Sequence, residues 1–517
     1  MDTKDEVKSV ELALYPPGTQ VWFTNVGPRQ SIPELREQLN DQAKPTQTSD
    51  SPNDPLNWPA WRRDILLFTA GFNSFLCAAL CPILATGFPA ISETFGVSNQ
   101  QVSFNIGIYM LGLGVGAAVW SPTAALFGRR PVYVAGSVLL IASSAWAAAS
   151  PSYASLMIAR LVQGIASSPG EFLVSVTISE IYQPHERGFR LGIYMLLLAA
   201  GKSLAPLIGA GVIKGLGWRW ALWLTTILSG ISFSFIFLFA RETYWARGAR
   251  SEISTASYRT LGEIYTDNLS ISPPLPFKHT MALWNGRFQE ASWLSLALKP
   301  FRLLNSVPLL WSAAVYALSL GWLAVLADTI SHLFQSVDGY GFTPMQTGLL
   351  YISPLLGTIL GSVVGGKVSD ILACMKAYRN NGIYEAESRL VMLIPATIAT
   401  VIAFGGYGWS IETHAHWIVP TVCFGFIYFG CILGSTIAVT YCLDCHKSSA
   451  IEAQVILSLL KNSHGLAFSL FVVDWVKASG PRDTFLEIAG IHLAFLLATV
   501  PLYIYGKRVR VWMQGKC

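Results

Sequence analysis

The 517-residue sequence has few charged residues: Asp, Glu, Lys and Arg make up 13% of it, against 52% hydrophobic residues. Soluble domains usually carry about 25% charged residues. Half that share, together with many apolar runs of about 20 residues, excludes an ordinary soluble protein and predicts a polytopic membrane protein in a lipid bilayer. A nucleic-acid partner is not expected, because the net charge is only +5 and no basic stripe interleaves with aromatic residues.

Signals of several other protein classes are missing. The first ten residues, MDTKDEVKSV, are polar and precede no apolar run, so we expect no cleavable signal. Most of the eight cysteines fall in or at the ends of apolar runs, which argues against an extracellular disulfide framework. Gly201-Lys202-Ser203 lacks the upstream glycine and strand of a phosphate-binding loop. No nucleophile–base pair or metal-spaced His/Glu cluster occurs within the apolar segments, so we predict no enzyme, cofactor or metal.

Twelve apolar segments are predicted to cross the membrane as helices, in two sets of six. They cover roughly residues 65–91, 101–122, 131–149, 155–180, 191–213, 219–240, 304–330, 345–366, 390–408, 416–442, 452–474 and 485–506. The expected fold is therefore an all-α membrane protein with two pseudo-symmetric six-helix bundles, the arrangement of a secondary transporter. Its parts are a largely disordered cytoplasmic tail (1–64), a first bundle (65–240), a cytoplasmic central loop (241–303), a second bundle (304–506) and a short cytoplasmic tail (507–517).

Lys and Arg are distributed unequally between the two sides of these segments. One side carries Arg62, Arg63, Arg129, Arg130, Arg187, Arg190, Lys367, Lys376, Arg379, Lys507, Arg508 and Arg510. The loops on the other side, such as ISETFGVSNQ and WSIETHAHW, contain almost no Lys or Arg; the exceptions are Lys214, Arg219, Lys477 and Arg482. This asymmetry predicts that both termini are cytoplasmic.

The loop after the second segment reads SPTAALFGRRPVY, residues 121–133. It resembles the signature loop of the major facilitator superfamily, G-x3-D-R/K-x-G-R-R/K. Gly128, Arg129 and Arg130 match that pattern, whereas Ser121, Ala125 and Leu126 replace its first glycine, its acidic residue and its first basic residue. The resemblance implies a loop that clamps helix ends, in which the two arginines bind helix C-terminal carbonyls. The alternative is that both arginines are plain positive-inside anchors.

Two further motifs resemble the drug:proton antiporters of that superfamily. Residues 160–164 match R-x-x-Q-G through Arg160, Gln163 and Gly164, and the resemblance associates that arginine with proton coupling. The fifth segment follows G-x8-G-x3-G-P-x2-G-G in its spacing, with alanine in place of two glycines. The matching residues are Gly192, Gly201, Ala205, Pro206, Gly209 and Ala210. Small residues at this spacing let helices approach closely, and the proline can bend the helix.

Shorter stretches extend the resemblance from about Asp54 to Tyr505. They are DPLNWPAWRRD, HERG, GWRW, NNGIYEAESRL and YCLDC, and they are similar to a fungal branch of twelve-span antiporters that includes polyamine and multidrug transporters. The resemblance implies a monomer in the plasma membrane that uses the proton gradient; a vacuolar membrane is the alternative.

Charged residues inside the fourth and fifth segments are the main candidates for function. Arg160 and Glu171 are eleven residues apart, which places both on nearly one helix face about 16 Å apart along the axis. Ser168-Pro169-Gly170 is expected to loosen the helix and free carbonyls for ligand, water or ions. Glu171 is a candidate proton carrier or cation ligand, with a structural ion pair as the alternative. Lys202 disfavours a polycationic substrate and can bind an acidic metabolite; the alternative is a Glu171–Lys202 salt bridge.

Weaker candidates lie elsewhere. Lys461 and Asn462 fall inside the eleventh segment, and Asn73 in the first segment can bind substrate or join helices. Asp328 and Asp444 are expected at the membrane interface. Aromatic residues that can line an apolar pocket are Tyr109, Trp322, Tyr351 and Tyr428.

The sequence thus predicts a proton-coupled transporter whose two halves rock about a central site. We expect export of a small organic compound, such as a secondary metabolite or drug. The first alternative is a proton-driven importer of a cation, polyamine or nutrient. The second is a non-transporting sensor on the same fold, which the altered residues Ser121 and Ala125 favour and the short C-terminal tail disfavours.

Overall fold

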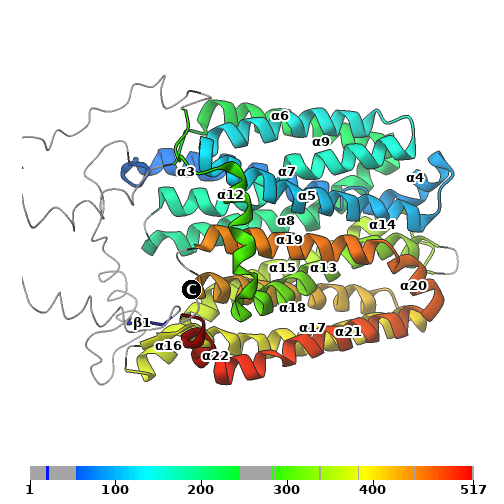
Figure 1. The fold of residues 1–517 in the computed structure, drawn as a ribbon. Coiled ribbons are helices and arrows are strands. Elements are labelled where there is room, and N and C mark those ends of the chain that lie inside the picture. The colour runs from blue at the N-terminus through cyan, green and yellow to red at the C-terminus, as the bar shows by residue number, and fades with distance from the viewer. Residues whose placement is uncertain are drawn as a thin grey trace, which may run out of the picture.

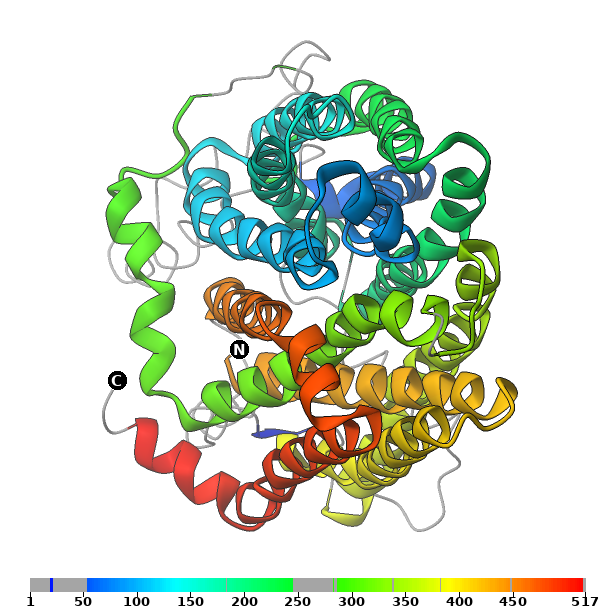
Figure 2. The same ribbon diagram turned by 90° about the vertical axis from the view of Figure 1, so that its right-hand side faces the viewer.

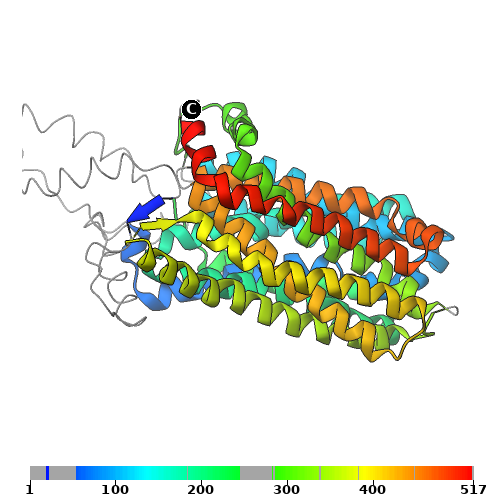
Figure 3. The same cartoon turned by 90° about the horizontal axis from the view of Figure 1, so that it is seen from below.

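The computed structural model describes residues 19–21, 54–182, 184–244, 282, 286–336, 339–381, 383–446 and 449–514, with the backbone alone for 20–21, 184–189 and 513–514. Most of the predicted N-terminal tail and central loop lies outside these residues. The helices run nearly parallel in a long bundle (Figures 1 and 3). We call the end with α16, α22 and β1 the tail end, and the end with α4, α14 and α20 the far end.

The first half consists of six membrane-length elements, one of which is broken. They are α3 (Ala60–Leu80) continued by η2 (Ala85–Gly87) and α4 (Phe88–Phe95), α5 (Asn99–Phe127), α6 (Arg129–Ala148), α7 (Tyr153–Ile181), α8 (Pro184–Leu216) and α9 (Trp218–Phe239). A short η1 (Pro55–Asn57) precedes them. The side chains of Ser98 and Ser152 cap α5 and α7, and Gly128 and Gly217 take positive φ angles of 95° and 90° at tight reversals between helices.

The second half repeats this arrangement with more breaks. Its elements are α13 (Val307–Gln335), α14 (Pro344–Leu349), α15 (Ile352–Val363), the π-helical turn η4 (Val364–Val368), α16 (Ser369–Arg379), η5 (Ala386–Met392), α17 (Leu393–Glu412), α18 (Ile418–Cys445), α19 (Ala450–Ser469), α20 (Val472–Ser479), α21 (Pro481–Leu497) and α22 (Thr499–Gln514). Before α13, α12 (Trp293–Leu298) and η3 (Pro300–Asn305) cross from the first half toward the second (Figure 2).

Among the described residues, ten helical segments are long and apolar enough to cross a membrane, and the pair α19–α20, bent by 49°, makes an eleventh. The 29-residue α7 takes the twelfth place in the fold, but it is too polar to count on composition alone. The all-helical, two-bundle prediction is therefore confirmed. The polar residues of α7 are also the ones that the sequence singled out.

The two halves meet along two equivalent pairs of helices. α5 packs against α19, and α8 packs against α14 and α15. These pairs join the second span to the eleventh and the fifth to the eighth, as expected for two bundles related by pseudo-symmetry. Seen along the helix axes, the two bundles lie one beside the other, and α19 lies close to the first half (Figure 2).

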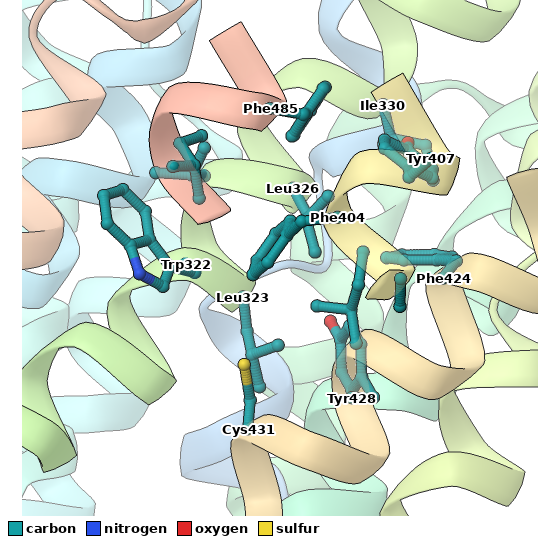
Figure 4. Close-up of a cluster of buried hydrophobic side chains, with 14 of the residues drawn as sticks. Trp322, Leu323, Leu326, Ile330, Phe404, Tyr407, Phe424, Tyr428, Cys431 and Phe485 are labelled. Carbon is teal, nitrogen blue, oxygen red and sulfur yellow. The ribbon is translucent and has the colours of Figure 1, made fainter. Parts of the chain in front are cut away.

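The core of the second half is rich in aromatic side chains. Trp322, Phe404, Tyr407, Phe424 and Phe485 pack together with aliphatic residues between α13, α17, α18 and α21 (Figure 4). Three aromatic residues that we expected around a pocket belong to this cluster instead: Trp322, Tyr351 and Tyr428 are at most 3% exposed. Their position reflects burial against neighbouring helices, which hydropathy alone does not separate from pocket lining.

Part of the N-terminal segment is ordered against the second half. β1 (Thr19–Val21) pairs antiparallel with β2 (Ile383–Glu385), the only strand ladder in the described part of the chain. Thr19 also accepts a hydrogen bond of 3.2 Å from Arg510, whose guanidinium binds Glu387 through two bonds of 2.9 and 2.6 Å. The predicted tails are thus not wholly unstructured: α22 continues to residue 514, and three residues of the N-terminal tail form a strand.

Candidate functional site

α7 is held close to α5 by a crossing of two glycines. A Cβ on Gly164 would lie 2.2 Å from the carbonyl oxygen of Tyr109 and 2.9 Å from Gly112, so only glycine fits. Such a close crossing brings the polar side chains of α7 into the interior of the first half. Arg160 and Gln163 are fully buried, and Glu171 is 9% exposed.

Arg160 binds the broken end of α3. It donates to Gln163 Oε1 (2.6 Å) and to the carbonyls of Leu80 (2.9 Å) and Cys81 (3.1 Å), and its guanidinium lies 4.6 Å from the centre of the Tyr109 ring. The carbonyls at the end of a helix lack helical donors, and a buried cation satisfies them. Arg160 therefore holds the break in α3 and does not line the cavity described below.

The other polar groups of this stretch join helices. Gln163 donates to Ser144 on α6 at 2.7 Å. Pro169 leaves the carbonyl of Ile165 without its helical donor, and the Trp120 indole supplies that donor at 2.9 Å. We expected this freed carbonyl to be available to ligand, water or ions, and that expectation was wrong because a side chain of α5 already occupies it.

Glu171 forms an ion pair between the two halves. The ammonium of Lys461 on α19 donates to Glu171 Oε1, and both side chains are at most 10% exposed. The Tyr194 hydroxyl on α8 donates to the backbone carbonyl of Glu171. The Glu171–Lys202 salt bridge that we considered is absent, since the carboxylate binds the lysine of the opposite half instead.

A small cavity lies beside this ion pair. Glu171, Lys202, Lys461 and Asn462 provide its polar lining, and the remaining wall consists of Cys77, Ala78, Cys81, Met110, Leu113 and Leu198. No hydrogen bond or ion pair joins Lys202 to the described part of the chain, although its charge interacts with Glu171. The side-chain amide of Asn462 is buried and has no hydrogen-bond partner there.

Asp328 is a second buried carboxyl group, on α13. It is 1% exposed, and its Oδ2 accepts a hydrogen bond from the Ser469 hydroxyl, whereas its Oδ1 has no partner among the described residues. This residue was expected at the membrane interface; its side chain is buried between helices and binds Ser469, which also takes part in the contacts at the far end. Asp444, in contrast, lies near the tail end and binds Arg389.

Cys81 lies close to several of these charges: its carbonyl accepts a hydrogen bond from Arg160, and its side chain lines the cavity with Glu171, Lys202 and Lys461. Arg160, Lys202, Lys461 and Asp328 all interact electrostatically with its thiol, and Cys81 shares the cavity wall with Glu171. Five charged groups from four helices thus surround the point at which α3 breaks. Three are cations and two are carboxyl groups, so the region carries excess positive charge.

At the far end, hydrogen bonds close the interface between the halves. Gln100 and Ser103 of α5 donate to the carbonyl of Ser469, at 2.8 and 3.0 Å. Gln335 of α13 donates to the carbonyl of Thr86, in the break of the first span, at 3.0 Å. Each bond connects a side chain to a carbonyl exposed by a helix break in the other half.

The motif on α8 forms the contact between that helix and α3. A Cβ on Gly201 would lie 2.3 Å from the carbonyl oxygen of Phe75, and one on Gly209 would lie 2.4 Å from that of Ile83. Gly192 has open space around it. The expected close approach is therefore present at two of the three glycines, and Lys202 follows the first of them directly.

Replacing Gly201 by Ala is expected to lower stability by about 1–3 kcal/mol, because backbone oxygen blocks the new methyl group and the helices must separate. Gly192→Ala is the matched control, since no atom of the described residues lies within 4 Å of its Cβ position. Thermal unfolding of the two purified variants in detergent checks this. Equal melting temperatures would show that α8 and α3 are not in close contact.

Pro206 and Ala210 continue the same motif on another face of α8. A Cβ on Gly348 of α14 would lie 2.5 Å from the Ala210 side chain and 3.3 Å from the Pro206 carbonyl oxygen. The motif thus packs against its own half through glycines and against the other half through these two residues. Asn73 accepts a hydrogen bond from Ser232 on α9 at 3.2 Å, which is the helix-joining role.

The loop at Gly128 is built as a clamp on helix ends. Arg129 donates to the carbonyl of Ala124 (2.6 Å), near the end of α5, and Arg130 donates to that of Phe237 (3.1 Å), near the end of α9. The predicted binding of helix C-terminal carbonyls is confirmed for both arginines. A Cβ on Gly128 would lie 2.3 Å from the carboxylate of Glu242.

Two glutamates that sequence reasoning missed supply the negative charge of this loop. Glu180, the second-last residue of α7, binds the Arg129 side chain at 2.7 Å. Glu242 accepts the backbone N–H groups of Arg129 and Arg130 at 2.8 and 3.1 Å, at the N-terminus of α6. Burial raises the pKa of the Glu242 carboxyl above its ordinary value, and these N–H groups oppose the rise. Glu180 and Glu242 thus supply the negative charge that the motif loses where Ala125 replaces its acidic residue.

The second half contains the same pairing. Arg389, just before α17, binds Asp444, the second-last residue of α18, at 3.2 Å, and also binds Asp370 at 2.7 Å. Because α17 and α18 correspond to α6 and α7, Arg389 takes the place of Arg129. The signal available in the sequence was an acidic residue next to the end of the fourth and tenth spans.

Comparison with known proteins agrees with this architecture. The family model described as Major Facilitator Superfamily matches residues 65–456. The chain belongs to the major facilitator superfamily. Protein HOL1 of Saccharomyces cerevisiae is 24% identical over 90% of both chains, and the efflux pump radE of Floropilus chiversii is 27% identical over 89% of this chain and 83% of its own. Among solved structures, the proton:xylose symporter XylE shares the fold, with a TM-score of 0.59 and 14% identity over 87% of this chain and 96% of that one.

Membership of the major facilitator superfamily makes this a multi-pass membrane transporter of small molecules and not an enzyme. Facilitators carry substrate between two half-bundles near the membrane midplane. The cavity beside Glu171, Lys202 and Lys461 is lined from both halves and lies between the breaks at the far end and the arginine clamps at the tail end.

Proposed function

We propose that the protein is a proton-coupled transporter that exports a small organic compound. The observation that carries this proposal is the Glu171–Lys461 ion pair, which joins the two halves inside the bundle and borders a cavity. Intramembrane charges are costly and mark transport pathways. An ion pair between the halves has to break or rearrange when the halves rock, so it links the charges in the cavity to the relative position of the halves.

Alternating access is supported by where the contacts between halves lie. The far end is closed by the bonds from Gln100, Ser103 and Gln335 to carbonyls at helix breaks. These bonds join neutral groups, so separating the halves exposes dipoles to water and leaves no stranded charge. The Glu171–Lys461 pair is the costlier contact to separate, because each partner would be left as a buried charge unless substrate or a proton compensates it.

Asp328 is better placed than Glu171 to carry the proton. In this arrangement of the halves Glu171 has a cationic partner, Lys461, whereas the Ser469 hydroxyl is the one hydrogen-bond partner of the Asp328 side chain among the described residues. Burying a carboxylate without a cation is costly. Cys81 and Tyr351, from neighbouring segments, interact with Asp328, and neither side chain is a cation. Ser469 also provides the carbonyl that closes the far end, so the protonation of Asp328 acts on the same serine as that contact.

Export from a plasma membrane with both termini in the cytoplasm is the direction we propose. It rests on the motif of α8, on the basic residues of the tail end and on a relative named as an efflux pump. The alternative importer of a cation is less well supported, because Lys461 already neutralises the only carboxylate that lines the cavity in the described part of the chain. No structural observation favours a sensor.

The test compares producing cells that carry the wild-type chain, a deletion, or Asp328→Asn, with small molecules measured inside the cells and in the medium. We expect a compound to accumulate inside in the deletion strain, and export in Asp328→Asn to stop responding to a protonophore. A medium component that is no longer depleted would establish the importer instead. Asp474→Asn, which replaces an exposed residue at the far end, is the control.

A further inference from the structure

We infer that the transported compound is an organic anion and that Lys202 binds its acidic group. This inference deepens the proposed function by naming the substrate class of the same cavity. It rests on the charges that converge there and on which of them already have partners.

The positive charge of the cavity is not balanced by the protein. Glu171 neutralises Lys461, which leaves Lys202 without an acidic partner among the described residues. The guanidinium of Arg160 donates to backbone carbonyls, and no carboxylate among the described residues pairs with it. Asp328 is the second carboxyl group near Cys81, and even when it is ionised the cations outnumber the carboxylates by one. A cation in a low-dielectric site favours a ligand of opposite charge.

The rest of the lining fits an acid with an apolar body. Six of the ten lining residues are apolar or thiol side chains, from α3, α5 and α8. Asn462 presents a buried amide whose oxygen and nitrogen have no hydrogen-bond partner among the described residues, so it can bind one further polar group of the ligand. A polyamine would meet Lys202 and Lys461 with its own positive charges, which excludes it as a well-bound substrate.

The arrangement makes a prediction that a structural role for Lys202 would not make. Lys461→Gln frees Glu171 to pair with Lys202, so it should abolish the preference for anions although Lys202 is still present. Glu171→Gln leaves two unpaired lysines in the cavity and should strengthen the binding of anions, even in a variant whose transport is impaired. The two partners of one ion pair therefore shift affinity in opposite directions.

The experiment measures equilibrium binding to the purified full-length protein in detergent. The probes are three scaffolds, naphthalene, phenyl and hexyl, each as carboxylate, amide and amine. We expect a carboxylate to bind at least about tenfold tighter than its amide, a preference lost in Lys202→Gln and in Lys461→Gln and increased in Glu171→Gln. Lys214→Gln is the matched control, because this lysine lies near the end of the same helix and is exposed.

Three results would overturn the inference: amides or amines that bind as well as carboxylates, carboxylate binding that survives Lys202→Gln, or no carboxylate binding on any scaffold. Transport into proteoliposomes under a pH gradient keeps this separate from the proposed function. If a pH gradient drives transport of an amine and no carboxylate binds, the proposal of a proton-coupled transporter stands and the inference of an anionic substrate is rejected. If carboxylates bind through Lys202 but no pH gradient drives their transport, the inference of an anionic substrate stands and proton coupling is rejected.

Discussion

Glu171→Gln is expected to lower stability by about 3–5 kcal/mol and to abolish transport, because it strands the ammonium of Lys461 in a site that is 1% exposed. Folded proteins are stable by only about 5–15 kcal/mol, so a loss of this size shows clearly in thermal unfolding of the purified protein. Transport is measured in proteoliposomes with the compound identified from cells.

The reverse change, Lys461→Gln, is expected to cost less than Glu171→Gln. Glu171 then retains Lys202 as a nearby cation, whereas no second carboxylate lines the cavity for Lys461 in the described part of the chain. The double variant Glu171→Gln/Lys461→Met should regain most of the stability, since removal of both charges leaves neither unpaired. Transport should remain absent in the double variant, because the connection between the halves is gone.

Lys299→Gln is the control for this series. Lys299 binds Glu452 near the tail end and is 55% exposed, so its loss should cost less than about 1 kcal/mol. A double variant that is as unstable as the sum of its two single variants would show that Glu171 and Lys461 do not interact.

Arg160→Lys is expected to lower stability by about 3 kcal/mol, through the loss of two hydrogen bonds from a charged donor. The planar guanidinium has several N–H donors and donates to Gln163 and to two carbonyls at the end of α3, whereas the ammonium of a lysine cannot reach all three acceptors. Transport should fall with it, because the break in α3 borders both the cavity and the far-end contacts. Thermal unfolding and proteoliposome transport measure the two effects.

Arg219→Lys serves as the comparison, because Arg219 makes a single bond of 3.0 Å to the carbonyl of Ser150 at the far end. Its loss should be below about 1.5 kcal/mol. Equal effects of the two substitutions would mean that Arg160 contributes no more than the half-buried Arg219, whose guanidinium lies over the Trp218 ring.

The helices follow from hydropathy, because the bilayer requires apolar segments of a set length, and their division into two halves follows from the polar stretch between residues 241 and 300. Close approach at Gly201 and Gly209 also follows from residue type and spacing. The ion-pair partner of Glu171 cannot be predicted in this way. Lys202 and Lys461 are both lysines within apolar segments, and the choice between them depends on how α8 and α19 are rotated about their axes, which local sequence does not encode.

Asp328 shows the same limit from another direction. Its position near the end of a span gave no sign that the side chain is buried, because the burial depends on Ser469, which lies where α19 bends into α20 and donates to the carboxyl group. Glu180 and Glu242 were missed because they complete the arginine loop from distant parts of the chain, 51 and 113 residues away from Arg129.

The ladder between β1 and β2 means that the halves are joined twice. The first described residues, Thr19–Val21, pair with β2 of the second half; the chain later forms α3 of the first half and reaches the second half again through α12. The two halves are therefore linked in a closed loop, by the covalent chain through α12 and by the hydrogen bonds of the β1–β2 ladder. In such a closed loop, each half keeps the other at a high effective concentration even while the helix interface between them is open. Rocking can then expose the cavity with little risk that the halves drift apart.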